Sequence, residues 1–210
     1  MFATPEDTAL VARMLAGDET AFAHMVDTHH GAMFRLAMVF TKDRGAAEEV
    51  TQETWLAVVD GIDRFEARSS LKTWLFNILV NKARTRAKRD ARMVSTADFS
   101  EEAIARQRSV DAARFGGPKN HWTQPPREWS ISPEDHLMTR QLAQVIKDTI
   151  ESLPANQRVV VTLRDVEGMT AAQTCELLDL SNGNHRVLLH RGRAALRSAV
   201  ESYLTGDEGV

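Results

Sequence analysis

The side chains best suited to chemistry in this chain are amides and cations that recur at helical spacing between residues 71 and 88. Side-chain amides can hydrogen-bond the edges of nucleotide bases, and lysine and arginine bind phosphates. The spacing places these polar side chains on one face of a helix and apolar side chains on another. The polar face is Thr73, Asn77, Asn81, Arg84 and Lys88, and the apolar face is Leu71, Trp74, Leu75 and Ile78. The pattern predicts a helix that binds a nucleic acid.

Charge is distributed unevenly along the chain. The formal net charge of −3 argues, taken alone, against nucleic-acid binding, but the position of charge matters more than its sum. Residues 71–92 contain seven cations and one anion, and residues 181–198 contain four arginines and no acid. Each run alone is consistent with a solvated helix face. Two such runs favour two surfaces that bind a polyanion.

The segment before the first basic run, residues 43–61, predicts an acidic amphipathic helix. Acids near its start are favoured by the helix dipole. One face is apolar, and the opposite face is acidic with a leucine in its middle. The apolar face is Ala47, Val50, Thr54, Ala57 and Val58. The acidic face is Glu49, Gln52, Glu53, Leu56 and Asp60. A face that meets only water does not need Leu56, so the pattern favours a docking surface for a protein.

A polar loop, residues 63–70, joins these two helices and holds one aromatic side chain, Phe65. The ring either anchors the loop in the core or stacks on an unpaired base, which aromatic side chains do well. The loop residues alone favour the anchor.

Residues 132–205 have the order of a helix-turn-helix. Thr170 and Gln173 form a capping box that opens a short helix, a turn follows at residues 179–181, and Ser181 caps the last helix. The outward side chains of that last helix are Arg186, His190, Arg193 and Arg197, with Arg191 beside them. The start of such a helix enters the major groove of DNA, and later cations meet phosphates.

The composition and spacing together predict an all-α chain of two small helical domains joined by a flexible linker. The predicted limits are residues 8–92 and 132–205, with residues 93–131 as the linker because periodicity fades there. A single cysteine fits the reducing cytosol, and no apolar run is long enough to span a membrane. Residues 1–15 lack a secretory signal. We therefore expect a cytoplasmic protein.

Catalytic chemistry is not indicated. His24, His29 and His30 lie close together, but no acid or cysteine completes a metal-ligand set. No glycine-rich phosphate loop or catalytic triad is present, so we expect neither an enzyme nor a bound cofactor. A dimeric helix-turn-helix transcriptional regulator remains an alternative, but it leaves the acidic helix and its loop without a role.

Two pairs of stretches resemble one family. VTQETWLAVVDGIDRF and SSLKTWLFNILVNKAR, at residues 50–65 and 69–84, resemble the second region of extracytoplasmic-function sigma factors. LPANQRVVVTLRDVEGMT and LLDLSNGNHRVLLHRGRAALR, at residues 153–170 and 177–197, resemble the fourth. These proteins are exchangeable promoter-recognition subunits of bacterial RNA polymerase. The resemblance implies an alternative sigma factor that binds core RNA polymerase and directs promoter-specific initiation.

The resemblance also implies roles for residues of the second region. The acidic helix of the family docks on the largest polymerase subunit, and its loop and following helix open the minus-ten element and capture a flipped base. For this chain, the polymerase-binding residues are then Glu49, Gln52, Glu53 and Trp55. The minus-ten residues are Phe65, Lys72, Asn77, Asn81 and Lys82. The resemblance thus reverses the interpretation of Phe65.

The fourth region of the family reads the minus-thirty-five element. The matching positions here are Arg164, Arg186, His190 and Arg191. Val187 and Leu188 replace the hydrogen-bonding residues usual in the family, so we expect a different DNA sequence to be read. His185 stands where a buried valine is usual and is expected to be a core histidine with a partner.

The resemblance implies two further interactions. The linker of the family threads through the polymerase, which gives a role to Trp122, Pro125, Pro126 and Trp129. Members of the family are usually held inactive by an anti-sigma factor, so we expect one as a partner.

Overall fold

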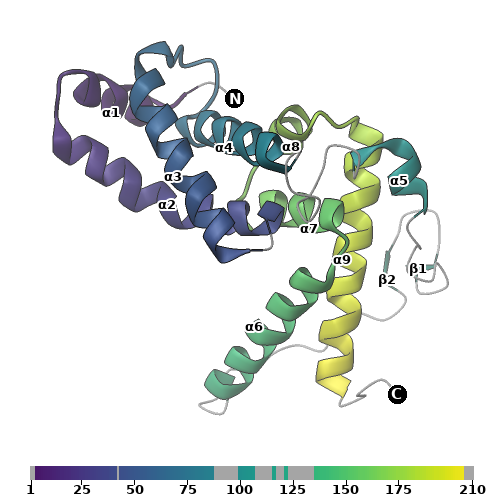
Figure 1. Cartoon of the computed structure of the whole chain (residues 1–210). Helices are drawn as coiled ribbons and strands as arrows, with labels where there is room; N and C mark the ends of the chain where they lie inside the picture. Colours follow the sequence, from purple (N-terminus) through teal and green to yellow (C-terminus); the bar gives the residue numbers. More distant parts are fainter. Residues whose placement is uncertain are drawn as a thin grey trace.

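The chain folds into helices that form two packed groups (Figure 1). The structure is a computed structural model that describes residues 3–41, 43–87, 99–106, 115–116, 121–122 and 135–205. The α-helices are α1 (Pro5–Leu15), α2 (Glu19–Thr41), α3 (Arg44–Gly61), α4 (Leu71–Ala87), α5 (Glu101–Arg106), α6 (Asp135–Ser152), α7 (Ala155–Val161), α8 (Ala171–Leu178) and α9 (Asn182–Thr205). A short 3-10 turn, Ile62–Arg64, follows α3, and a π-helical turn, Thr162–Val166, follows α7. The predicted all-α fold is confirmed.

Helices α1 to α4 form the N-terminal domain. Thr4 begins α1 with a capping box, in which Asp7 N–H donates to the Thr4 hydroxyl at 3.1 Å and Thr4 N–H donates to the Asp7 carboxylate at 3.2 Å. Gly17, with a φ of +85°, allows the turn into α2. The interior is formed by fully buried side chains of α2, α3 and α4: Met25, Met33, Leu36, Phe40, Val50, Leu71, Leu75 and Phe76.

Helices α6 to α9 form the C-terminal domain. Figure 1 shows α6 and the second half of α9 projecting side by side away from the other helices. Near their far end, the Tyr203 hydroxyl donates to the Gln141 side-chain oxygen at 2.9 Å. Helix α7 crosses α9 at Gly192, where an added Cβ would lie 2.5 Å from a methyl carbon of Val161. This approach requires glycine.

The predicted capping residues of the helix-turn-helix are confirmed. Thr170 and Gln173 cap each other at the start of α8, which ends at Leu178. Asp179 adopts the left-handed conformation in the turn, with a φ of +55°. The hydroxyl of Ser181 then accepts from Asn184 N–H at 3.2 Å and caps α9. Residues 132–134, where order was predicted to restart, lie outside the described residues.

The predicted linker contains regular structure that the sequence did not indicate. Helix α5 packs on α9, with Phe99 and Ile104 only 6% and 4% exposed. Two short antiparallel strands, β1 (Phe115–Gly116) and β2 (His121–Trp122), pair further along. A helix of six residues is too short to show a periodicity. Pro125, Pro126 and Trp129 lie outside the described residues.

The two domains contact each other directly. Helix α2 packs against α7, and α4 packs against α8 (Figure 1). Within the described part of the chain, no helix is both long enough and apolar enough to cross a membrane.

Candidate protein and nucleic-acid interfaces

Helix α3 presents the predicted acidic face to solvent. Its buried side is Ala47, Val50, Thr51, Thr54 and Val58. Gln52 and Glu53 are exposed on the opposite side. Leu56, nearer the C-terminal end of the helix, is 66% exposed. Beside this face lies an open hollow of about 260 Å³ lined by His30, Phe34, Arg44, Glu48 and Gln52. Val59, one helical turn after Leu56, is also 54% exposed, so this side of α3 carries two neighbouring apolar side chains beside its acids and amides.

The other two predicted polymerase-binding residues are engaged within the N-terminal domain. Glu49 is exposed but forms an ion pair of 2.5 Å with Arg86 of α4, and this hydrogen bond lowers the pKa of the carboxyl. Trp55 is half-buried, donates from Nε1 to Nδ1 of His30 at 3.2 Å, and meets the ring of Phe22 edge-on. The two side chains are therefore already oriented by α4 and α2.

The loop before α4 holds Phe65 half-buried. Its ring contacts the edge of Trp74, with centroids 5.6 Å apart and planes at 69°. Ser70 fixes the start of α4, because its hydroxyl accepts from Thr73 N–H at 3.2 Å. One side of the Phe65 ring thus packs on protein, while the residue keeps part of its surface in solvent.

The polar face of α4 is divided between solvent and the C-terminal domain. Asn81 is exposed, and Asn77 and Lys82 are half-buried. At the start of the helix, Thr73 is only 2% exposed because the side-chain amide of Gln173 in α8 donates to its hydroxyl at 2.8 Å. Lys88, Arg89 and Arg92 lie outside the described residues.

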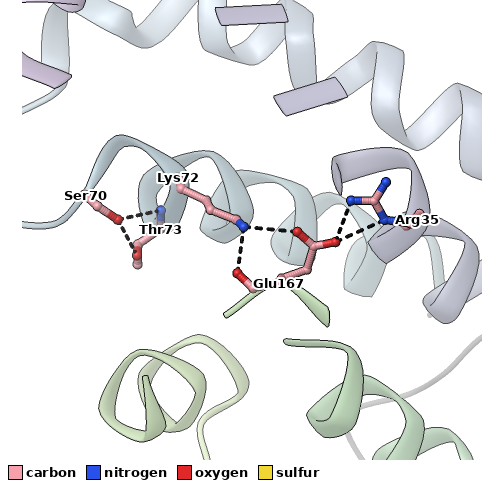
Figure 2. Close-up of polar contacts among 5 residues, drawn as sticks. All are labelled: Arg35, Ser70, Lys72, Thr73 and Glu167. Carbon is pink, nitrogen blue, oxygen red and sulfur yellow. Dashed lines mark hydrogen bonds and ion pairs between the residues drawn. The ribbon is translucent and has the colours of Figure 1, made fainter. Parts of the chain in front are cut away.

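Lys72 points at the C-terminal domain (Figure 2). Its Nζ donates to the backbone oxygen of Glu167 at 2.7 Å and to the carboxylate of the same residue at 3.0 Å. Arg35 of α2 binds the other carboxylate oxygen through Nε at 3.2 Å and a terminal nitrogen at 3.0 Å. Glu167, on the turn after α7, therefore joins two helices of the N-terminal domain.

The predicted minus-thirty-five residues differ in their surroundings. Arg186 and His190 are exposed on the first half of α9. Arg191 is half-buried and donates to the backbone oxygen of Ile104 in α5. Arg164 donates to the backbone oxygen of Met169 and so stabilises the turn before α8. Arg186 and His190 are the two residues of this set that are exposed to solvent.

Two expectations for the last helix need correction. Leu188 is fully buried, so its predicted replacement of a DNA-facing residue is wrong, because the side chain belongs to the core. His185 is buried as expected, but its Nε2 has no hydrogen-bond partner in the described part of the chain. Burial, reinforced by the charges of Arg164, Arg186 and Arg193, lowers the pKa of His185.

The histidines of α2 do not form a metal site in the part of the chain that the structure covers. His24 and His30 are exposed and His29 is half-buried. Among the described residues, no group of three or more histidine, cysteine, aspartate or glutamate side chains has an arrangement that could hold a metal ion.

Comparison with known proteins identifies the family. The Sigma-70 region 2 family matches residues 25–93, and the Sigma-70, region 4 family matches residues 143–196. The ECF RNA polymerase sigma-E factor of Escherichia coli (strain K12) is 26% identical over 197 residues, which cover 93% of this chain and 94% of that protein. The ECF RNA polymerase sigma factor SigX of Bacillus subtilis (strain 168) is 27% identical over 183 residues, with 87% and 85% covered. The chain belongs to the extracytoplasmic-function group of RNA polymerase sigma factors.

The sigma factor also resembles solved structures in fold. CnrH in complex with the cytosolic domain of CnrY has a TM-score of 0.54 and 20% identity, with 93% of this chain and 97% of that chain covered. The sigma factor RpoE of Bartonella quintana, solved with the anti-sigma factor NepR, has a TM-score of 0.52 and 20% identity, with 86% and 96% covered. The fold is therefore that of two sigma-factor domains.

The matched regions coincide with the surfaces described above. The region 2 match begins within α2 and spans α3, the Phe65 loop and α4, and the region 4 match begins within α6 and ends within α9. The sequence did not single out Arg35 and Glu167, although they link the two regions of the sigma factor (Figure 2). A lone acid before a turn glycine carries no signal for such a contact, because its partners lie far away in the chain.

Proposed function

We propose that this sigma factor uses three surfaces in turn: the exposed face of α3 for core RNA polymerase, the Phe65 loop with α4 for the minus-ten element, and α9 for the minus-thirty-five element. The observation that carries the proposal is the solvent-exposed acidic face of α3, with Leu56 at its centre, one loop away from a basic, amide-bearing helix. A dimeric regulator of operators has no use for such a face.

The polymerase contact is assigned to Gln52, Glu53 and Leu56, with Glu49 and Trp55 at its border. Exposed carboxylates attract a basic partner surface and set its orientation, while burial of Leu56 contributes the apolar part of the interface. Arg86 and His30 orient Glu49 and Trp55 beforehand, which reduces the entropy lost on binding.

Opening of the minus-ten element is assigned to Phe65, with Asn77, Asn81, Lys82 and Lys72 along α4. Unstacking one base costs a few kcal/mol, and stacking on an aromatic ring returns about 1–3 kcal/mol. The amides then meet base edges and the lysines meet phosphates. Trp74, which contacts one edge of Phe65, holds the ring in place.

Duplex binding at the minus-thirty-five element is assigned to Arg186 and His190 on α9, with Arg191 and Arg164 nearby. Binding by these cations should weaken steeply with salt, because each neutralised phosphate releases counterions. The polymerase carries out synthesis, so the sigma factor needs no catalytic group of its own. The domain limits of residues 8–92 and 132–205 remain predictions.

An anti-sigma factor is proposed as the regulator of this chain, in the cytoplasm. The likeness of fold to RpoE, which was solved with the anti-sigma factor NepR, supports this proposal.

Transcription in vitro tests the function. Purified chain and core polymerase are incubated with a library of genomic fragments, and the start sites are mapped. We expect starts preceded at fixed distances by two shared elements, and none with core polymerase alone. Equal initiation with and without the chain, together with no retention of the chain on core polymerase, would refute the proposal.

A further inference from the structure

We propose that Val187, on the exposed side of α9, recognises the minus-thirty-five element through the C5 methyl group of a thymine. The inference rests on the proposed function and deepens it, because it names the base that one residue of α9 reads. It is carried by the place of Val187 on the helix, the charge around it and the chemistry of its side chain.

Val187 belongs to an exposed stripe on the first half of α9, and its side chain is 39% exposed. The stripe, called the reading face below, consists of four exposed residues: Gly183, Arg186, Val187 and His190. Counted from the first of them, the others follow after three, four and seven positions, which is the spacing of one helix face. Leu188, the next residue, is fully buried and fixes the rotation of α9 about its axis. Val187 is therefore held on the outer side of the helix.

The charge around Val187 favours DNA as its partner. A single exposed valine is ordinary on a protein surface and indicates nothing by itself. Here, however, the other two side chains of the reading face are Arg186 and His190, and residues 181–198 contain four arginines and no acid. A duplex has phosphates along both edges of its major groove, so it complements cations that lie beside an apolar group.

The start of the reading face allows a close approach. A Cβ added at Gly183 would have the hydroxyl oxygen of Ser181 as its nearest neighbour, at 3.8 Å, so the packing of α9 does not require glycine there. A backbone without a side chain lets a ligand come near the helix. The short side chain of Val187, one turn further along, can then reach the edges of the bases.

The side chain of Val187 can recognise only one of the four bases by direct contact. It has no hydrogen-bond donor or acceptor, so it cannot pair with the polar atoms that bases present in the major groove. Thymine alone adds a methyl group to that edge, and apolar side chains recognise thymine by contact with it. Adenine or cytosine at the same place would bury an amino group without a partner, which costs affinity. Val187 therefore selects thymine.

Removal of the thymine methyl group tests the proposal. The full chain is assembled with core polymerase, and fluorescence polarisation measures binding to a labelled promoter duplex taken from the mapped start sites. Each thymine of the minus-thirty-five element is replaced in turn by deoxyuridine, which keeps its base pairing and lacks only the methyl group. The variant is Val187→Ala. The control is Leu204→Ala, which removes another exposed apolar side chain about 25 Å further along α9.

For the wild type, we expect deoxyuridine at one position of the element to weaken binding about four- to tenfold, as the loss of a buried methyl group does. Val187→Ala should bind the thymine duplex more weakly by a similar factor, and the same deoxyuridine should then have no further effect. Leu204→Ala should respond to deoxyuridine as the wild type does. Such non-additivity is expected of two groups that touch. Circular dichroism confirms that the variants are folded.

Three results would overturn the proposal. The first is a wild type that binds every deoxyuridine duplex as tightly as the thymine duplex. The second is a Val187→Ala variant that remains as sensitive to deoxyuridine as the wild type, because another residue then reads the methyl group. The third is a Val187→Ala variant that is retained less by core polymerase and still responds to deoxyuridine, because Val187 then contacts protein.

The same titration separates this inference from the proposed function. If the wild type with core polymerase binds the mapped promoter no better than a duplex of scrambled sequence, the proposed function fails. If promoter binding is specific but insensitive to the thymine methyl groups, only the role of Val187 fails.

Discussion

Helices α3 and α4 are neighbours in one small bundle, yet their functional faces are in opposite situations. The acidic face of α3 is open to solvent, with Gln52 and Glu53 exposed. The polar face of α4 is partly covered by another domain, which buries Thr73 and binds Lys72. The difference teaches that a cationic face, whose charges attract any anion, can be partly covered by the chain itself, while a neighbouring acidic face stays exposed to solvent.

The largest expected effect is on polymerase binding, for a variant of the exposed face of α3. Leu56→Lys should weaken binding of core polymerase by at least about 30-fold, because a central exposed apolar side chain is where an interface loses about 2 kcal/mol or more. Binding is measured by fluorescence polarisation of labelled chain titrated with core polymerase.

The control for this variant is Asp27→Lys, which places the same charge at an exposed position of α2. It should bind polymerase as the wild type does. Equal losses for the two variants would mean that added charge, rather than the α3 face, is responsible, and the contrast between α3 and α4 would not hold.

The next largest effect is expected in the loop before α4, where a variant should impair promoter opening and leave polymerase binding intact. Phe65→Ala should leave polymerase binding unchanged and slow promoter opening about 5- to 150-fold, because stacking of a base on an aromatic ring contributes about 1–3 kcal/mol. Permanganate reactivity of unpaired thymines at the minus-ten element measures the opening. Phe65→Trp keeps a stacking surface and should restore most of it. Normal opening by the alanine variant would refute base capture.

The contrast also shows how far the sequence could predict the site. The exposed and buried faces of α3 follow from helical spacing, because both depend on packing within one local bundle. The pairing of Lys72 and the burial of Thr73 do not, since their partners Glu167 and Gln173 lie 95 and 100 positions away. The charge pattern predicts that α4 binds a polyanion, and it does not indicate that part of the same helix face contacts protein.

The last helix shows a related limit. Its caps and its outward Arg186 were predicted correctly from local chemistry. Leu188 was assigned to the DNA side by alignment with the family pattern, yet it is fully buried. Apolar side chains at neighbouring positions of a helix point in different directions, so Val187 at 39% exposure and Leu188 in the core differ although both are aliphatic. Here hydrophobicity predicted burial better than resemblance did.

A smaller effect concerns the domain that covers α4. Because the pKa of His185 lies below its ordinary value of 6.5, the unfolded chain binds more protons than the folded chain just below that pH. Stability is therefore complete above about pH 6.5 and decreases as the pH falls towards the lowered pKa. We expect the Tm to fall between pH 7.5 and 5.5, with smaller hydrogen-exchange protection factors in α9, taken relative to the intrinsic exchange rate at each pH.

The matched variant is His185→Leu, which keeps an apolar side chain of similar size in the core and cannot titrate. Its Tm should depend less on pH than that of the wild type. His29 in α2 also has a lowered pKa, chiefly because of burial and then the charge of Lys72, so part of the pH dependence should remain. If the Tm of His185→Leu depends on pH as strongly as that of the wild type, the whole pH dependence is assigned to the N-terminal domain.

The smallest effect lies at the junction of the two faces, where Glu49 of α3 pairs with Arg86 of α4. The hydrogen bond lowers the pKa of Glu49 below 4.5, so the pair stabilises the fold above that pH and loses its contribution as the pH falls through the lowered value. Because the carboxylate is exposed, Glu49→Gln should shift the Tm at pH 7 only slightly. At high salt, wild type and variant should melt alike, since screening removes the attraction.

The variant should also bind polymerase more weakly than wild type if Glu49 belongs to the docking face. Unchanged polymerase binding would confine Glu49 to joining the two helices and leave the docking face to Gln52, Glu53 and Leu56.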